Sequence, residues 1–297
     1  MTSDKPLPKP LVSRNEWCYK SRKRKAIEET SQPIVSVVIP SYNQGHFLES
    51  TIRSVLQQDY PKIECIVIDG GSKDNSRAIL EYYDPWITYW QSEPDNGQAD
   101  AINLGLDKAS GGIAMFLNSD DMIFPGAIKK VVAEFQKHPD ALVIHGNRVL
   151  MSAEGEVLGW GNNCDFDPKE SGYTIPSECA YWRTNALGEP QRFHAELKFA
   201  LDLEFFCRLF LRGRFQRIDA FLGYFRVHDD AKSFTMQDTR KSESTLLWRE
   251  FFGVEWDPSL WKSPKNPIRQ YVLGIKNCRY VLFPWTLRKL KKVFNRS

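Results

Sequence analysis

The sequence predicts an α/β protein whose mainly parallel, Rossmann-like sheet carries helices on both faces. Between residue 34 and about residue 145, short β-branched runs alternate with stretches in which apolar residues recur at helical spacing. Short links separate these segments, so they form βαβ units, which place their strands in parallel. Hydrophobic residues make up 42% of the 297 residues and charged residues 26%, which excludes a disordered, collagen-like or disulfide-dense chain.

The expected strands of the first half are apolar along their whole length, which is typical of strands buried on both faces. We expect them at residues 34–39, 63–68, 87–90, 113–117 and 141–145. Helices are expected between them. Leu48, Ile52 and Val55 share one helical face, and Asp74 can cap the next helix. The later helices are expected at residues 75–83, at residues 98–109 and after Pro125.

The alternation ends after residue 145. We expect a hairpin over residues 149–158, an irregular stretch to about residue 178, a helix over about residues 200–212 and a last strand over residues 221–227. The chain is thus predicted to hold one α/β domain over residues 31–257, composed of a first half (31–145) and a second half (146–257). A basic flexible extension over residues 1–30 precedes this domain, and a basic tail over residues 258–297 follows it.

The net charge of +3 arises from basic ends on an acidic body. Residues 1–26 contain eight Lys or Arg against two acids, and residues 258–297 contain ten Lys or Arg and no acid. The body between them keeps 22 basic residues against 35 acidic ones, so no basic face remains for a nucleic-acid partner. The basic ends suit an anionic surface, and a membrane is the expected one.

Other features of the sequence predict a cytoplasmic protein. Residues 1–30 lack the apolar core of a signal peptide, and no stretch approaches the about 18–20 apolar residues of a membrane span. The six cysteines are scattered without a C-x-x-C pair, which is typical of reduced thiols and not of a zinc site.

Polar segments directly follow four of the expected strands, at residues 40–43, 69–74, 93–100 and 118–121. Ligands of open α/β sheets bind outside the carboxyl ends of the strands, so these segments predict the site. Neither G-x-G-x-x-G after the first strand nor a P-loop is present, which argues against dinucleotide and P-loop chemistry. H-E-x-x-H and G-x-S-x-G are absent as well.

Two carboxylates, Asp120 and Asp121, stand side by side at the end of an apolar run. A buried acidic pair is costly unless a positive charge shares the site, and Mg²⁺ or Mn²⁺ bridging to a diphosphate would supply it. The alternative is that one of them caps the following helix. Asp69 likewise has two interpretations, since it can accept hydrogen bonds from a nucleobase or hold the turn at Gly70 and Gly71.

Four segments together resemble the ordered motifs of the family-2 glycosyltransferases. They are VVIPSYN at residues 37–43, IDGGSKD at 68–74, DNGQADAIN at 95–103 and FLNSDD at 116–121. The resemblance covers about residues 34–230 and implies the type-A glycosyltransferase fold with a nucleotide-sugar donor. Asn118 replaces the first aspartate of the family's Asp-x-Asp motif, which removes a charge but retains an acceptor for a ribose hydroxyl.

The resemblance also implies roles for individual residues of the first half. Asp120 would be the metal ligand, and Asp121 could share the metal shell. The nucleotide-sugar would be held by Pro40, Tyr42, Asn43, Asp69, Ser72, Asp74, Asn96, Asp100, Asn118 and Ser119.

In the second half, residues 200–208 resemble the family's acidic helix, which implies that Asp202 is the catalytic base. Glu204 is the weaker candidate because it points in a different direction on a helix. FRVH at residues 225–228 resembles a late motif in which His228 meets the metal or the diphosphate. The family's acceptor contacts would fall on Tyr181, Trp182 and Arg183, although the two aromatic residues fit a core role equally well.

The predicted reaction is an inverting, Mn²⁺- or Mg²⁺-dependent transfer from a nucleotide-sugar, by default a UDP-sugar, to an acceptor hydroxyl of a glycan or lipid-linked acceptor. The inner face of the plasma membrane is the expected place. Two alternatives remain: a sugar-phosphate nucleotidyltransferase, although residues 41–45 lack its basic loop, and a non-catalytic nucleotide-sugar-binding module.

The C-terminal tail carries a basic amphipathic pattern. Leu287, Leu290, Val293 and Phe294 form one helical stripe beside four basic residues, and Pro284 is expected to divide the tail into two short helices. Such a helix suits the surface of an anionic membrane. The alternative is that the tail packs on the acidic body.

Overall fold

The computed structural model describes residues 6–12, 16, 18, 32–161, 175–253 and 255. Near the C-terminus it describes residues 272, 274–277, 280, 281, 284–286, 288 and 289. The strands are β1 (Val35–Ser41), β2 (Ile63–Asp69), β3 (Tyr89–Ser92), β4 (Ile113–Phe116), β5 (Met122–Ile123), β6 (Ala141–Ser152), β7 (Val157–Gly161), β8 (Ala180–Arg183) and β9 (Arg214–Val227). The α-helices are α1 (Gly45–Leu56), α2 (Ser76–Tyr83), α3 (Gln98–Lys108), α4 (Ala127–Lys137), α6 (Leu201–Phe210), α7 (Lys232–Thr235) and α8 (Gln237–Phe252), and two 3₁₀ turns are η2 (Asp84–Trp86) and η3 (Ser177–Cys179).

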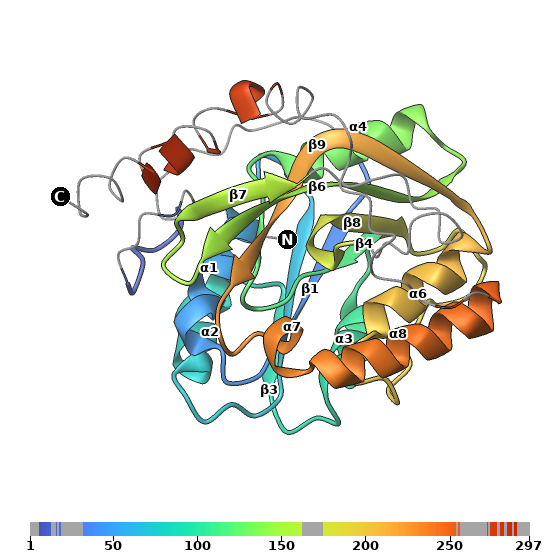
Figure 1. The fold of residues 1–297 in the computed structure, drawn as a ribbon. Coiled ribbons are helices and arrows are strands. Elements are labelled where there is room, and N and C mark those ends of the chain that lie inside the picture. Colours follow the sequence, from blue (N-terminus) through green and yellow to red (C-terminus); the bar gives the residue numbers. More distant parts are fainter. Residues whose placement is uncertain are drawn as a thin grey trace.

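The described strands form one nine-stranded sheet in the order β3-β2-β1-β4-β8-β6-β9-β5, with β7 paired to β6 (Figure 1). Strands β3, β2, β1 and β4 are parallel, which confirms the predicted βαβ arrangement of the first half. In the rest of the sheet, β8 is antiparallel to both β4 and β6, and β5 is antiparallel to β9. The whole sheet is therefore mixed. The antiparallel β8 was not predicted because a four-residue strand carries little periodicity.

Helices cover the sheet on both sides, as expected. Helix α3 packs on the face that carries Val38 and Ile68, since a Cβ on Gly105 would lie 2.3 Å from a Val38 methyl group and 3.4 Å from Ile68 Cγ1. Side chains alternate along a strand, so Val37 and Ile39 face the opposite side. Figure 1 shows α1 and α2 grouped apart from α3, α6 and α8.

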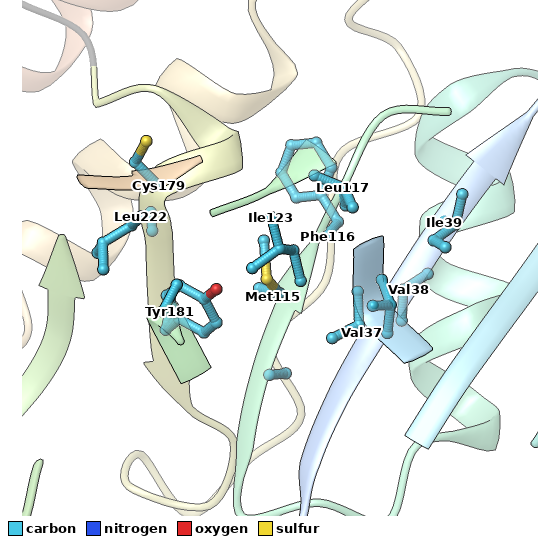
Figure 2. Close-up of a cluster of buried hydrophobic side chains, with 14 of the residues drawn as sticks. Val37, Val38, Ile39, Met115, Phe116, Leu117, Ile123, Cys179, Tyr181 and Leu222 are labelled. Atoms are coloured by element: carbon cyan, nitrogen blue, oxygen red, sulfur yellow. The ribbon is translucent and has the colours of Figure 1, made fainter. Parts of the chain in front are cut away.

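The main hydrophobic core lies between the sheet and the helices that cover it. Figure 2 shows Val37 and Ile39 of β1, Met115 of β4, Tyr181 of β8 and Leu222 as members of one cluster of buried side chains. All five have no exposed surface. The cluster thus joins the parallel half of the sheet to the mixed half, so the two predicted halves form one packed body.

The described part of the N-terminal extension is packed against the body, which corrects the prediction that it is a flexible appendage. The backbone N–H groups of Leu11 and Val12 donate to the Glu49 carboxylate at 2.7 and 3.2 Å. Arg53 donates to the carbonyl oxygen of Cys18 at 3.1 Å, and Cys18 is fully buried. Glu49 and Arg53 are buried charged residues of α1, so they need polar partners, and the extension provides them.

The described tail residues also contact the body. Val281 is fully buried, the Tyr280 and Phe124 rings lie 5.8 Å apart, and Trp285 lies 5.6 Å from Trp160. Arg288 forms a 3.2 Å ion pair with Glu156. These contacts agree with the packing alternative. The stripe of Leu287, Leu290, Val293 and Phe294 lies outside the described residues.

No described helix combines the length and the apolar character needed to cross a bilayer.

Candidate active site

The carboxyl ends of three parallel strands meet at one edge of the sheet. Ser41 at the end of β1 is paired with Asp69 at the end of β2, and Asp69 is paired with Ser92 at the end of β3. This register places the predicted polar segments next to one another, as the strand-end rule requires. Pro40 fits within β1 because the pairing of β1 with β4 ends at Val38, so the missing N–H interrupts no hydrogen bond to β4.

Asp69 holds the turn after β2. Its carboxylate accepts from the Ser72 backbone N–H at 3.0 Å, from the Ser72 hydroxyl and from the Ser92 hydroxyl at 2.7 Å, and its side chain is fully buried. Gly71 follows with a φ of 77°, in the left-handed region that favours glycine. The sequence left two interpretations of Asp69 open, an acceptor for a nucleobase and a residue that holds the turn. In this structure Asp69 holds the turn.

The first two loops are locked together by the predicted residues Asn43, Ser72 and Asp74. The Asn43 backbone N–H donates to Ser72 Oγ at 2.7 Å, and the Lys73 N–H donates to Asn43 Oδ1 at 2.8 Å. Asn43 adopts a φ of 53°, which asparagine tolerates better than most residues. Beside this junction the Tyr42 side chain is 61% exposed, so an aromatic face is open at the edge of the sheet.

Asp74 fixes the start of two helices at once. Its carboxylate accepts from the Gly45 N–H at the start of α1 at 2.8 Å and from the Ser76 N–H at the start of α2 at 2.9 Å. Partial burial acts to raise the pKa of Asp74, but these hydrogen bonds hold it below the usual value. The Asp74 carboxylate thus orders the loops before α1 and α2, and it is not a free acceptor for the ligand.

The third loop presents amide and carboxylate groups at the start of α3. Asp100 accepts from the backbone N–H of Asn96 at 3.0 Å and from its side-chain amide at 3.2 Å. Gln98 donates from Nε2 to Asn118 Oδ1 at 2.7 Å, which joins this loop to the segment after β4. Asn118 is therefore held in place by a hydrogen bond that an aspartate would also accept.

Asp120 and His228 meet across the site. His228 Nε2 lies 3.0 Å from Asp120 Oδ2, and the Asp120 side chain is 21% exposed. Thr51 Oγ1 lies 2.7 Å from the carbonyl oxygens of both Ser119 and Asp121, so α1 holds the backbone on each side of Asp120. Ser119 is itself buried. The pairing of Asp120 with His228 brings together two residues that are 108 positions apart.

Asp121 points into the protein, which corrects its assignment to the metal shell. Its side chain accepts from the Arg226 backbone N–H at 2.9 Å and is only 1% exposed as a residue. Burial, with the charges of Asp120 and Glu178, raises the pKa of Asp121 well above its usual value. Asp121 is thus a structural partner of β9, and Asp120 alone of this pair faces the site.

Arg226 is the main site-supporting residue that the sequence reasoning missed. It is fully buried, and its Nε donates to the Asp120 carbonyl oxygen at 2.7 Å. Its guanidinium also pairs with Glu16 of the N-terminal extension at 3.0 Å and donates to Ser50 Oγ at 3.0 Å. One feature of the sequence could have identified Arg226. It stands two residues before His228, in the segment that resembles a family motif.

Asp202 stands in the first turn of α6 and is half-buried. Burial raises the pKa of Asp202 to about 6, against a hydrogen bond from the Leu203 N–H, so its ionised form is a better proton acceptor than an exposed aspartate. Glu204 instead forms an ion pair with Arg208 at 2.9 Å and is buried. Its carboxylate is therefore occupied, in agreement with its weaker standing as a base.

The start of α6 is held from α8. The Glu243 carboxylate accepts from the backbone N–H groups of Lys198, Phe199 and Ala200 at 3.0, 3.0 and 2.8 Å. Helix α8 was not predicted from the sequence. It positions the turn that carries Asp202.

The three predicted acceptor residues lie in the sheet, which corrects that prediction. Tyr181 is fully buried and Trp182 is 1% exposed, with the Trp182 ring 4.9 Å from that of Phe205. Arg183 donates to the carbonyl oxygens of Ala141 and Phe135 at 3.0 and 2.8 Å. Neither aromatic ring has a free face for a sugar, so the core alternative describes both.

Asp120 and His228 are the described side chains that best suit a divalent cation. No group of three or more His, Cys, Asp or Glu side chains among the described residues is arranged to hold a metal ion. One carboxylate and one imidazole fit the mode in which Mg²⁺ or Mn²⁺ takes its remaining oxygens from water and substrate phosphates. The donor set thus fits a cation that arrives with a diphosphate.

Sequence relatives of this chain include glycosyltransferases. It is 50% identical over 93 residues to an uncharacterized glycosyltransferase of Mycobacterium tuberculosis, covering 31% of this chain and 36% of that protein. It is 42% identical over 130 residues to the putative teichuronic acid biosynthesis glycosyltransferase TuaG of Bacillus subtilis, covering 43% of this chain and 51% of that one. The matches therefore span about a third to a half of the relatives' own length.

Solved structures show the same fold. The mannosyltransferase PcManGT of Pyrobaculum calidifontis, in complex with GDP-Man and Mn²⁺, superposes with a TM-score of 0.58 at 18% identity, covering 86% of this chain and 74% of that one. TarS 1–349 of S. aureus, in complex with UDP-GlcNAc, superposes with a TM-score of 0.53 at 19% identity, covering 73% and 71%. These likenesses confirm the predicted type-A glycosyltransferase fold.

The family model for "Glycosyl transferase family 2" matches residues 36–213, which include all of β1 except Val35, strands β2 to β4, the Asn118–Asp120 segment and Asp202. The match covers more than half of the chain and agrees with the fold and with the order of its strand-end segments. The protein belongs to glycosyl transferase family 2.

Proposed function

We propose that the protein transfers a sugar from a nucleoside-diphosphate donor to an acceptor hydroxyl with inversion at the anomeric carbon. The observation that carries the proposal is the contact of Asp120 with His228, together with a second, separate carboxylate whose pKa is raised, Asp202. The charges of Asp120 and Asp202 both act on Lys232, so the two carboxylates share one neighbourhood. The Asp120–His228 pair suits binding of the diphosphate. The Asp202 carboxylate suits acceptance of the proton from the acceptor hydroxyl. A transferase that inverts needs these two functions on opposite faces of the sugar.

The nucleoside is proposed to bind at the edge formed by the ends of β1, β2 and β3. Tyr42 offers an exposed ring on which a nucleobase can stack, and the Asn43–Ser72 junction beside it is rigid. Asn96, Asp100 and Asn118 supply amide and carboxylate oxygens for ribose hydroxyls. UDP is the proposed nucleotide, supported by the UDP-GlcNAc complex of the similar TarS structure.

The diphosphate is proposed to lie against Asp120 and His228, which would hold Mn²⁺ or Mg²⁺ together with it. A bound divalent cation would neutralise the charge that develops on the leaving nucleoside diphosphate. The Mn²⁺ complex of the similar PcManGT structure supports this part of the proposal. Arg226 and Thr51 keep the Asp120 backbone in place, so the carboxylate does not have to reorganise when the donor binds.

Asp202 is proposed to be the general base. It would accept the proton of the acceptor hydroxyl while the acceptor oxygen attacks the anomeric carbon from the side opposite the diphosphate. The carbon–oxygen bond to the β-phosphate breaks, and its electron pair leaves with the nucleoside diphosphate. Because Asp202 has a pKa of about 6, it is ionised at neutral pH and still basic enough to assist the transfer.

Glycan or lipid-linked acceptors at the cytoplasmic face of the plasma membrane are the proposed partners. The similarity to TuaG, the putative teichuronic acid biosynthesis glycosyltransferase, supports a cell-surface polysaccharide as the product. The predicted amphipathic stripe of the tail would provide a peripheral contact with anionic lipid. Among described tail residues, Lys289 is exposed and lies 5.5 Å from the Trp285 ring, so a basic group faces outward there.

A donor screen tests this function. Thermal shifts with UDP- and GDP-sugars in the presence of Mn²⁺ identify the donor, because a ligand that binds only the native state raises the apparent stability. Release of nucleoside diphosphate from that donor is then measured with and without EDTA. Metal-dependent release supports a transferase. Formation of pyrophosphate from a nucleoside triphosphate and a sugar phosphate would instead support a nucleotidyltransferase, and binding without any turnover would support a non-catalytic module.

A further inference from the structure

Lys232, at the first position of α7, faces the candidate site but was not among the predicted site residues. Its Nζ donates to Gln98 Oε1 at 2.7 Å and lies 3.4 Å from the Lys198 carbonyl oxygen. The same Gln98 side chain donates to Asn118, two residues before Asp120. Helix α7 follows β9 along the chain (Figure 1). Lys232 stands four residues after His228.

The charge of Lys232 is not taken up by a direct ion pair. Both hydrogen-bond acceptors of its Nζ are uncharged, and among the described residues no carboxylate oxygen pairs with it within 4.0 Å. Lys232 is exposed as a residue, and partial desolvation of its ammonium group lowers its pKa, while the charges of Asp120, Asp202 and Glu243 act on it in the opposite direction and favour the ammonium form. The ammonium thus lies in the field of the proposed metal ligand and of the proposed base.

Each of these three carboxylates has its own partner. Asp120 contacts His228, Asp202 accepts from the Leu203 N–H, and Glu243 accepts from the backbone before α6. Lys232 is therefore a cation placed among anions without being bound by any of them. The ammonium carries three N–H donors and has two described acceptors, so one donor remains for an oxygen atom of a ligand.

Two further polar atoms near this part of the chain lack partners among the described residues. They are the hydroxyl of Ser233, the residue after Lys232, and Nδ1 of His228, and both atoms are buried. Buried polar atoms are normally satisfied, so an unpaired nitrogen on the ring that contacts Asp120, and an unpaired hydroxyl next in sequence to Lys232, indicate that a polar ligand completes the site. This observation is independent of the charges around Lys232.

We infer that Lys232 binds the β-phosphate of the donor and stabilises the nucleoside diphosphate as it leaves. The inference rests on the proposed function and adds a catalytic residue to it. When the bond between the anomeric carbon and the β-phosphate oxygen breaks, the electron pair stays on that oxygen. Lys232 donates a hydrogen bond to the diphosphate and keeps its proton, while the acceptor proton goes to Asp202.

Binding of nucleotides that differ by one phosphate tests the inference. Lys232→Met removes the charge and keeps the length of the side chain, and Lys232→Arg keeps the charge. Titration calorimetry with UDP and with UMP, each with Mn²⁺, is expected to show UDP affinity reduced about 10-fold or more in Lys232→Met and UMP affinity unchanged. Lys232→Arg should retain most of the UDP affinity. Lys129→Met, an exposed lysine of α4, is the matched control and should bind both nucleotides normally.

Turnover gives the second readout. Loss of one preorganised donor to a developing anion lowers kcat by about 10²–10³-fold, so Lys232→Met is expected to lose about that much kcat at an unchanged melting temperature. Wild-type UDP affinity and kcat in Lys232→Met would overturn the inference and leave the proposed function intact. If the wild-type protein binds no nucleoside diphosphate, GDP included, both fail together.

Discussion

The buried pair between Glu16 and Arg226 leads to a quantitative prediction about the N-terminal extension. Arg226 has no exposed side-chain surface and Glu16 has 1%, and their charged atoms lie 3.0 Å apart. Removing one partner of such a pair leaves an uncompensated buried charge, at a cost of about 3–5 kcal/mol. Glu16→Ala is therefore expected to lower the free energy of unfolding by that amount. Glu16→Gln should lose less, because its amide oxygen still accepts from the guanidinium.

Thermal unfolding measures this loss. A domain of about 150–250 residues loses about 2–4 °C of melting temperature per kcal/mol, so Glu16→Ala is expected to melt about 10 °C lower. The matched control is Glu81→Gln, which breaks an ion pair with Arg77 whose side chains are 56% and 61% exposed. An exposed pair of this kind contributes about 0.3–0.5 kcal/mol, so the control should melt within about 2 °C of the wild type. Equal melting temperatures for Glu16→Ala and the control would refute the packed extension.

Three further predictions concern the site and the tail. Asp120→Ala is expected to abolish transfer and weaken UDP binding with Mn²⁺ while the fold persists. Asp121→Ala should instead lower the melting temperature, because it removes a buried acceptor of the Arg226 N–H. Nearly normal turnover of Asp120→Ala in EDTA would contradict the metal assignment. Since Asp202 must be deprotonated to act as a base, kcat/KM is expected to fall about tenfold per pH unit below about pH 6, and a flat profile between pH 5 and 7 would contradict this role. The full chain should sediment with anionic liposomes at low salt but not at high salt, and deletion of residues 284–297 should weaken the sedimentation. Equal sedimentation of both forms, or sedimentation of neither, would leave the tail only its role of packing on the body.

The parallel half of the sheet and the position of the site were predictable because both depend on local sequence. Apolar runs defined β1, β2 and β4, and the polar residues directly after them reached one edge by topology alone. Asn43, Ser72 and Asp74 were found in this way, and the structure shows them joined by hydrogen bonds.

The errors have physical causes that local sequence does not contain. Nothing in the pair Asp120–Asp121 reveals which side chain turns inward, since that is decided by the N–H of Arg226, 105 residues away. Arg226 itself is explained by Glu16, which lies 210 residues before it. Tyr181 and Trp182 stand in a strand of four residues, too short to identify as core from its pattern.

The measurement that tests the central claim most directly is the single-turnover rate of Asp202→Asn with the identified donor and an acceptor. The variant keeps the shape of the side chain but cannot accept the acceptor's proton. We predict a rate at least about 10²-fold below wild type with nearly unchanged donor affinity, while Glu196→Gln, an exposed carboxylate before α6, reacts normally. A normal rate in Asp202→Asn, or a loss confined to donor affinity, would contradict the assignment of Asp202 as the base.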